Sequence, residues 1–492
     1  MSRTPLASGV AERGMRREIP FHMPGHQRGR IVHPVMRELA KDVLRFDTTE
    51  VKGLDYLSTP SGIIQEAQSL ASEAFGADRS WFLVNGTTVG IHAAVMSVVR
   101  GEGDSIVLSR DCHQSAFSAL VLSGAVPVWA KPDYNEGFGF ATASAGGVRE
   151  ALEGCDEPPA GVLLVSPNYY GVCADVSEVA RACHHGQQVP LLVDEAHGSH
   201  FAFHERFPPS SLESGADLVV QSTHKTLGAM TQASMLHVKG ERVSSDSICT
   251  SLQVLQSSSP SYILMSSLDA ARAQASMASD YCDGEPGSEQ KFSRVVEDSL
   301  GAKEEINRIP GLQVLGGRGV DPLRLTVCVA QLGHNGFDVS SILEERHGIV
   351  PELANEKCVV FILTLSTTLQ DLEQLTRALR DVASSSRRAQ SGRDACSSED
   401  SSGLASVFDS PQVLSPREAF FSNQRRVDIG NAVGQISAET VCPYPPGIPI
   451  LCPGERITRD ALEFLQTFKS SGGYVTGCSD ATLSSILIVV NR

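Results

Sequence analysis

Short apolar runs that stop in polar residues recur along the chain and predict buried β-strands. The clearest runs are residues 81–84, 105–108, 162–165, 191–194 and 217–221. Between them lie stretches with apolar residues at helical spacing, such as residues 61–70, which begin with Ser61 as a candidate N-cap. Buried strands that alternate with helices predict a parallel or mixed sheet covered on both faces, and therefore an α/β fold.

Two of these predicted strands end in residues that can do chemistry. The first ends in Asp194, with His197 just beyond it, and the second is followed by Ser222, His224 and Lys225. Ligands of α/β sheets bind at the carboxyl ends of parallel strands. A lysine beside an apolar strand is costly to keep charged, so its amine is available for a Schiff base, and an aspartate can keep a pyridine nitrogen protonated. The pair predicts a pyridoxal phosphate (PLP) site, although Lys225 alone could be a surface lysine.

The order of several motifs resembles the ornithine/lysine/arginine decarboxylase family. Ser222-Thr223-His224-Lys225 and Asp194-Glu195-Ala196-His197 carry the resemblance, together with residues 21–26, 444–449 and 453–455. It implies a PLP-dependent fold like that of aspartate aminotransferase, with a mostly parallel sheet in the major domain. A small α/β domain and a C-terminal α+β domain are expected to follow. The expected boundaries are residues 1–60 (N-terminal arm), 61–290 (major domain), 291–382 (small domain), 383–410 (flexible linker) and 411–492 (C-terminal domain).

The turn after the predicted strand 81–84 suits a phosphate group. Gly86, Thr87 and Thr88 combine backbone N–H groups at a helix start with two hydroxyls. A simple capping turn is the alternative. The resemblance adds Ser222 and His224 to the residues expected to hold the PLP phosphate.

The same resemblance implies roles for two histidines and raises a question about the arm. His113 is expected to lie flat against the cofactor ring, although it could merely cap a helix. His197 is expected on the side of the ring hydroxyl. Relatives usually carry a lysine after Pro-Gly-His, where this chain has Gln27, so the role of that position stays open.

Composition and charge narrow the classes of function. The chain has 492 residues, 41% of them apolar and 20% charged, with a formal charge of −16, which is typical of a globular protein and argues against nucleic-acid or anionic-membrane binding. No apolar stretch approaches the length of a membrane span. Twelve cysteines without a C-x-x-C pair argue against structural zinc or a disulfide framework. We expect a cytoplasmic protein, or one from a plastid or other organelle if a targeting segment is truncated.

A metal centre is the weaker interpretation of the histidine cluster. His197, His200 and His204 have a spacing that could suggest metal ligands, but Asp194 is better used by PLP, and we expect no metal. The sequence contains neither a Walker A pattern nor a G-x-G-x-x-G motif after a predicted strand, so nucleotide chemistry has no support.

The resemblance implies decarboxylation of lysine, arginine or ornithine to the corresponding amine by a homodimer or higher homo-oligomer. An aminotransferase or lyase on the same fold would reuse Lys225 and Asp194, and a catalytically silent regulatory homologue is a further alternative. The distal cation of the substrate needs a carboxylate partner, since an unpaired buried charge costs several kcal/mol. Glu352, Glu439 and Glu455 are the candidates, and each could equally be a surface or capping residue.

Overall fold

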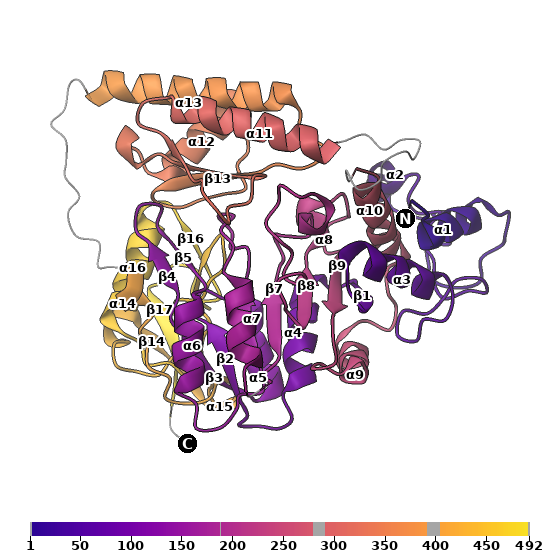
Figure 1. Cartoon of the computed structure of the whole chain (residues 1–492), viewed down its shortest axis with the longest axis horizontal. Coiled ribbons are helices and arrows are strands. Elements are labelled where there is room, and N and C mark those ends of the chain that lie inside the picture. Colours follow the sequence, from indigo (N-terminus) through magenta and orange to yellow (C-terminus); the bar gives the residue numbers. More distant parts are fainter. Residues whose placement is uncertain (1, 187, 279–290, 391–403, 491–492) are drawn as a thin grey trace. The chain divides into compact units, whose positions relative to one another are not determined.

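The computed structural model describes residues 2–186, 188–278, 291–390 and 404–490. The chain divides into two compact units, Met1–Val98 with Pro190–Phe292, and Val99–Val189 with Ser293–Arg492 (Figure 1). None of the described helices is both long and apolar enough to cross a membrane.

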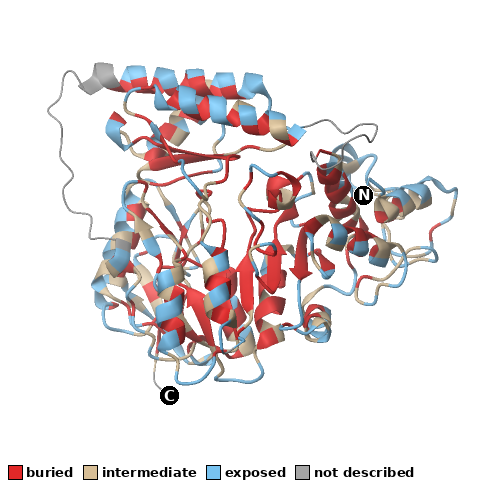
Figure 2. Cartoon of the chain, viewed as in Figure 1, coloured by how far each residue is buried: buried red, intermediate tan, exposed pale blue. Residues whose placement is uncertain are grey.

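The first unit contains four strands in the order β1-β9-β8-β7. β7 and β8 run parallel, whereas β9 is antiparallel to both β8 and β1. These strands are almost entirely buried, as Figure 2 shows. Their bounds are β1 (Arg79–Leu83), β7 (Leu191–Asp194), β8 (Leu218–Gln221) and β9 (Ser234–Val238).

Helices of the first unit pack closely on these strands. A Cβ atom at Gly90 of α4 would lie 2.4 Å from Val220 Cγ1 on β8, so only glycine allows this approach. Asp55 caps α3 from a distance by accepting the backbone N–H groups of Ser61, Gly62, Ile64 and Gln65. The helices are α1 (Pro5–Met15), α2 (Pro34–Ala40), α3 (Ile63–Phe75), α4 (Gly86–Val98), η1 (Phe201–Phe203), α8 (Thr223–Thr226), α9 (Ser245–Leu255) and α10 (Tyr262–Ala278).

The second unit begins with three parallel strands in the order β6-β2-β3 and a short hairpin of β4 and β5. The strands are β2 (Ser105–Ser109), β3 (Val126–Ala130), β4 (Asp133–Asn135), β5 (Phe140–Thr142) and β6 (Val162–Val165). The helices are α5 (Gln114–Ser123), α6 (Ala145–Glu153) and α7 (Val176–His184). The parallel pairing agrees with the α/β pattern predicted from the apolar runs.

An antiparallel sheet of order β10-β11-β13-β12 follows in the second unit. Its apolar face packs with α11, α12 and α13 in one core, and the outer faces of these helices are exposed (Figure 2). The elements are α11 (Lys291–Asn307), β10 (Gln313–Val314), β11 (Arg324–Cys328), η2 (Ala330–Leu332), α12 (Gly336–His347), β12 (Leu353–Ala354), β13 (Cys358–Ile362) and α13 (Leu369–Gln390).

The C-terminal part of the second unit is a small α+β arrangement around its own apolar core. Two antiparallel pairs, β14 with β17 and β15 with β16, accompany one long helix. The elements are α14 (Leu404–Val407), α15 (Pro416–Phe421), β14 (Gln424–Asp428), η3 (Ile429–Asn431), β15 (Cys442–Tyr444), α16 (Arg459–Ser470), β16 (Tyr474–Thr476) and β17 (Ser485–Val489).

The structure corrects the prediction of a wholly flexible linker at residues 383–410. α13 continues to Gln390, and Ala383 and Ser386 are buried. Beyond residues 391–403, which lie outside the described residues, Val407 is fully buried in the C-terminal core. Ala383 continues the apolar stripe of α13 by one more helical step after Leu379. The prediction was based on the serine-rich composition of the segment, which does not reveal this stripe.

Candidate active site

Asp194 and Lys225 lie at the carboxyl ends of two neighbouring parallel strands of the first unit. Asp194 is the last residue of β7 and lies opposite Val220 of β8, and Lys225 lies in the short helix α8 that follows β8. Lys225 Nζ is 3.0 Å from His197 Nε2, in the turn after β7. The fold thus brings together the predicted amine, carboxylate and imidazole at one edge of the sheet.

Burial controls the charge of Asp194. The residue is 6% exposed, and its Oδ1 accepts the backbone N–H of Ala196 at 3.1 Å. Removal from water raises the pKa of Asp194 to about 6, while the nearby charge of Lys225 acts in the opposite direction. A buried carboxylate of this kind gains most from a partner that donates a charged N–H.

A group of hydroxyls surrounds the start of α4. Thr87 Oγ1 lies 2.6 Å from Ser222 Oγ and 3.0 Å from Ser234 Oγ. Gly86 has φ +74°, which turns the chain from β1 into the helix. Thr88 is exposed at the same turn. The sequence analysis did not predict Ser234, because it lies on β9 and no sequence motif marks the antiparallel pairing of β9 with β8.

His224 faces the backbone of the following turn. Its Nδ1–H donates to Ala233 O at 2.9 Å, and burial lowers the pKa of the ring. A neutral imidazole with Nδ1 occupied leaves Nε2 as its acceptor.

Glu195 was also missed, although it stands beside Asp194 in the sequence. Its carboxylate is 1% exposed and accepts three hydrogen bonds, from Ser211 N at 2.7 Å, Ser211 Oγ at 2.6 Å and Gln221 Nε2 at 2.6 Å. Because Gln221 ends β8, these contacts tie together the two strand ends that carry Asp194 and Lys225. Burial raises the pKa of Glu195 to about 7.

His113 belongs to the second unit and caps α5. Its Nδ1 accepts the backbone N–H of Ser115 at 3.2 Å. This is the helix-capping role that the sequence offered as the alternative to contact with a cofactor ring. A Cβ atom at Gly447 would lie 3.4 Å from the imidazole ring, and Gln114 N donates to Gly447 O. The Tyr-Pro-Pro-Gly-Ile-Pro motif is therefore packed against His113. Its position against a cofactor ring stays a prediction.

The other histidines of the predicted cluster have local partners. His200 packs against Phe201 and Phe207, and His204 Nδ1 accepts the backbone N–H of Arg206. Within the described part of the chain, no three His, Cys, Asp or Glu side chains are grouped so that they could hold a metal ion.

Comparison with known proteins places this geometry in a family. Residues 4–318 match the Orn/Lys/Arg decarboxylase major domain, and residues 406–479 match the C-terminal domain of the same family. The chain belongs to the Orn/Lys/Arg decarboxylase family. Both the family and the fold class predicted from the motifs are confirmed.

Relatives match over nearly the whole length. The chain is 38% identical to Uncharacterized protein YaaO of Bacillus subtilis over 99% of both chains. It is 35% identical to an arginine decarboxylase of the same organism, over 99% of this chain and 98% of the relative. Lysine decarboxylase A from Pseudomonas aeruginosa has the same fold, with a TM-score of 0.81 at 20% identity, over 99% of this chain and 81% of the other.

The site residues of this family member suit PLP. The buried carboxylate of Asp194 would hold the pyridine nitrogen, and Lys225 would hold the cofactor through its amine. Hydroxyls of Thr87 and Ser222 and the N–H groups at the start of α4 would hold the phosphate. The donor set therefore fits an anionic phosphate at one end and a ring cation at the other.

Two of the three acids predicted to bind the substrate have partners within the chain. Glu455 is fully buried, forms an ion pair with Arg110 at 3.2 Å and accepts Cys452 N at 2.8 Å. Glu439 accepts Ser479 N at 2.6 Å and Leu487 N at 2.8 Å. Glu352 is exposed beside β12. Their substrate role stays a prediction.

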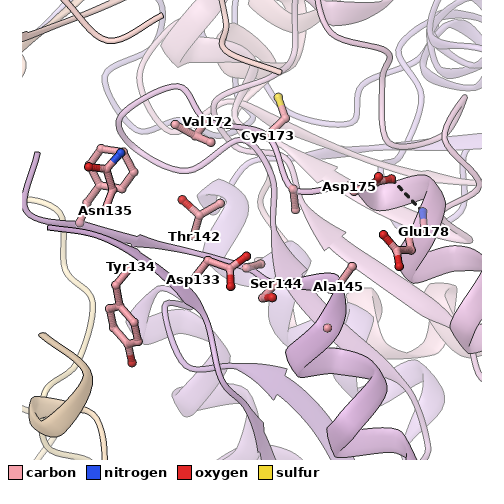
Figure 3. Close-up of a pocket in the computed structure, with 14 residues that line it drawn as sticks. Asp133, Tyr134, Asn135, Thr142, Ser144, Ala145, Val172, Cys173, Asp175 and Glu178 are labelled. Atoms are coloured by element: carbon pink, nitrogen blue, oxygen red, sulfur yellow. Dashed lines mark hydrogen bonds between the residues drawn. The ribbon is translucent and has the colours of Figure 1, made fainter. Parts of the chain in front are cut away.

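A separate pocket of about 470 Å³ lies in the second unit (Figure 3). The hairpin β4–β5 and the starts of α6 and α7 line it. Asp175 caps α7, and Glu178 forms an ion pair with Arg149. Asp175 and Glu178 thus have local structural roles, and the pocket alone identifies no ligand.

Proposed function

We propose that this chain is a PLP-dependent decarboxylase that converts arginine into its amine, agmatine, and CO2. The observation that carries the proposal is the convergence of Asp194, His197 and Lys225 at the ends of β7 and β8. When bound, PLP supplies an electron sink for the electron pair left on the substrate α-carbon after CO2 departs.

Asp194, His197 and Lys225 have different roles in this reaction. Asp194 keeps a proton on the ring nitrogen, a charge-stabilising role that is large in a water-excluded site. His197 holds Lys225 Nζ in place at 3.0 Å. Lys225 returns a proton to the α-carbon, which completes the amine.

The relatives favour arginine over the other basic amino acids. Proteins named arginine decarboxylase are 34–35% identical to this chain, whereas those named lysine decarboxylase are 23–25% identical. Lysine is the second candidate and ornithine the third. Arginine needs planar, bidentate acceptors, while the other two present a compact ammonium.

Substrate identity is tested by supplying arginine, lysine and ornithine in parallel and measuring CO2 and the amine product. We expect agmatine to form fastest. Cadaverine or putrescine as the main product would replace arginine with lysine or ornithine, and transamination products without CO2 would refute the decarboxylase proposal.

The cofactor site is tested by borohydride reduction and peptide mapping. We expect the label on Lys225 and its loss in Lys225→Ala, whereas Lys239→Ala, a change on the exposed side of the same unit, retains it. Asp194→Asn should bind PLP and lose most turnover. A label on another lysine, or full turnover in Asp194→Asn, would contradict the assignment.

We further propose a homodimer, or a multiple of it, in the cytoplasm. Apolar side chains of the N-terminal arm lie exposed, with Phe21 at 92%, Ile31 at 85% and Leu39 at 75%. The helix α2 has no buried residue at all. Large apolar side chains left exposed along one segment are typical of an interface between subunits. Light scattering that finds only monomer under active conditions would refute the assembly.

A further inference from the structure

Cys328 and Cys358 face each other across two antiparallel strands of the second unit. The register pairs Cys328 of β11 directly with Cys358 of β13. In the same register, Val329 N donates to Lys357 O at 2.8 Å, one pair beyond the cysteines, and Leu363 N donates to Leu323 O at 2.9 Å, five pairs before them. Bonded and non-bonded pairs alternate along an antiparallel ladder, so the cysteines form a non-hydrogen-bonded pair.

This pair type brings the two side chains close together. Its Cα atoms are about 4.5 Å apart, and its Cβ atoms are at the short end of the cross-strand range. Disulfides join cysteines whose Cα atoms lie about 4.4–6.8 Å apart. The backbone therefore already has the spacing of a disulfide, while both cysteines are reduced.

The surroundings of the two thiols differ. Cys358 is fully buried, and its thiol donates to Phe138 O at 3.3 Å; Cys328 is 8% exposed, and its thiol lies 3.7 Å from Gly137 O. Interaction with the neighbouring Cys358 side chain lowers the pKa of Cys328 to about 6, while the pKa of Cys358 is raised. Cys328 is thus the more accessible and the more reactive member of the pair.

We propose that Cys328 and Cys358 are a redox modification site, at which a hydroperoxide converts the two opposed thiols into a cross-strand disulfide. The Cys328 thiolate attacks the peroxide oxygen, which forms a sulfenic acid and releases hydroxide or an alkoxide. The Cys358 thiol then attacks that sulfur and releases water as the disulfide forms. Two thiols are oxidised, and one peroxide O–O bond is reduced.

Oxidation would alter the support of the β4–β5 turn. Both thiols contact carbonyl groups of that turn, at Gly137 and Phe138, and a disulfide has no S–H to donate. Asn355 Nδ2 also donates to Phe138 O at 3.1 Å, so the turn keeps part of its anchorage. Because β4 and β5 line the pocket of Figure 3, we expect the oxidised protein to show faster amide exchange in residues 133–142.

The test treats the full-length protein with hydrogen peroxide and maps its peptides without reduction. We expect a peptide pair joined through Cys328 and Cys358 and the loss of both thiols from alkylation, both reversed by dithiothreitol. Cys155 is a matched control, because it is partly buried just after α6 and its thiol donates to Ala151 O of that helix. Cys155→Ser should leave the linked pair unchanged.

Two variants distinguish a specific reaction between Cys328 and Cys358 from a general sensitivity of the protein to oxidation. Cys358→Ser should stop peroxide treatment at oxidised Cys328 without a link, and Cys328→Ser should slow oxidation of Cys358. Peptide mapping of the wild-type protein shows whether the disulfide forms even if a variant folds poorly. Irreversible oxidation of Cys328 with Cys358 still alkylatable, or a link to any other cysteine, would overturn the proposal.

Discussion

Glu455→Gln tests whether this acid stabilises the fold or binds the substrate. Glu455 and Arg110 form an ion pair in which the side chains are 0% and 3% exposed. Arg110 also donates to Pro449 O at 2.7 Å and lies within 5.5 Å of the rings of Phe117 and Trp129. A glutamine keeps the shape of the side chain but leaves the guanidinium charge buried without an anionic partner.

The expected loss of stability follows from that burial. Removing one partner of a buried ion pair costs about 3–5 kcal/mol, and the carbonyl partner at Pro449 places Arg110 near the lower end. A loss of about 3 kcal/mol lowers the melting temperature by on the order of 5–10 °C. The double variant Arg110→Met, Glu455→Met should lose less than either single change, since both desolvated charges leave together.

The assay combines thermal unfolding with steady-state kinetics on arginine. The matched control Glu463→Gln removes an exposed acid on α16 and should change stability by less than about 0.5 kcal/mol. If Glu455→Gln left the melting temperature unchanged and raised KM at constant kcat, Glu455 would be a substrate-binding acid and the structural interpretation would be wrong.

Three further changes test the site and its scaffold. Burial raises the pKa of Asp194 from 3.8 to about 6 in the folded protein. The protonated carboxyl therefore contributes its full stability to the fold below pH 3.8, and this contribution is lost as the pH rises through 6. Cofactor-free Asp194→Asn should therefore be more stable than wild type by about 3 kcal/mol at pH 8, and equal melting temperatures at pH 8 would refute this. Asp55→Ala should cost about 1–2 kcal/mol by uncapping α3, measured by denaturant unfolding, with Asp55→Asn retaining part of the cap. Glu352→Gln should raise KM for arginine at least tenfold, about 1.4 kcal/mol, and an unchanged KM would exclude Glu352 from the binding site.

Local sequence pattern predicted the strands and the position of Asp194 and Lys225 at neighbouring strand ends. The first three residues of both β7 and β8 are apolar, so burial and strand type followed from this local pattern. Asp194 and Lys225 were predictable because each stands at a strand end, and strand ends meet at one edge of a parallel sheet. Such inferences need no knowledge of distant contacts.

Contacts between distant parts of the chain were not predictable in this way. Ser61 looked like the N-cap of α3, but the cap residue is Gly62 and the capping carboxylate comes from Asp55. The partner of Glu455 is 345 residues away, at Arg110. Nothing in the spacing of either residue records the pairing, because only the folded topology brings them together.

The same reasoning changes the order of the candidate substrate acids. A carboxylate that binds the distal cation of arginine must offer free acceptor positions to a planar guanidinium. Glu455 already binds one guanidinium, that of Arg110, and Glu439 accepts two backbone N–H groups. Glu352 is exposed and lies close enough to Arg324 to affect that guanidinium electrostatically. A substrate guanidinium would have to displace existing bonds at Glu439 and Glu455, whereas at Glu352 it would displace mainly water, so Glu352 becomes the first of the three to test.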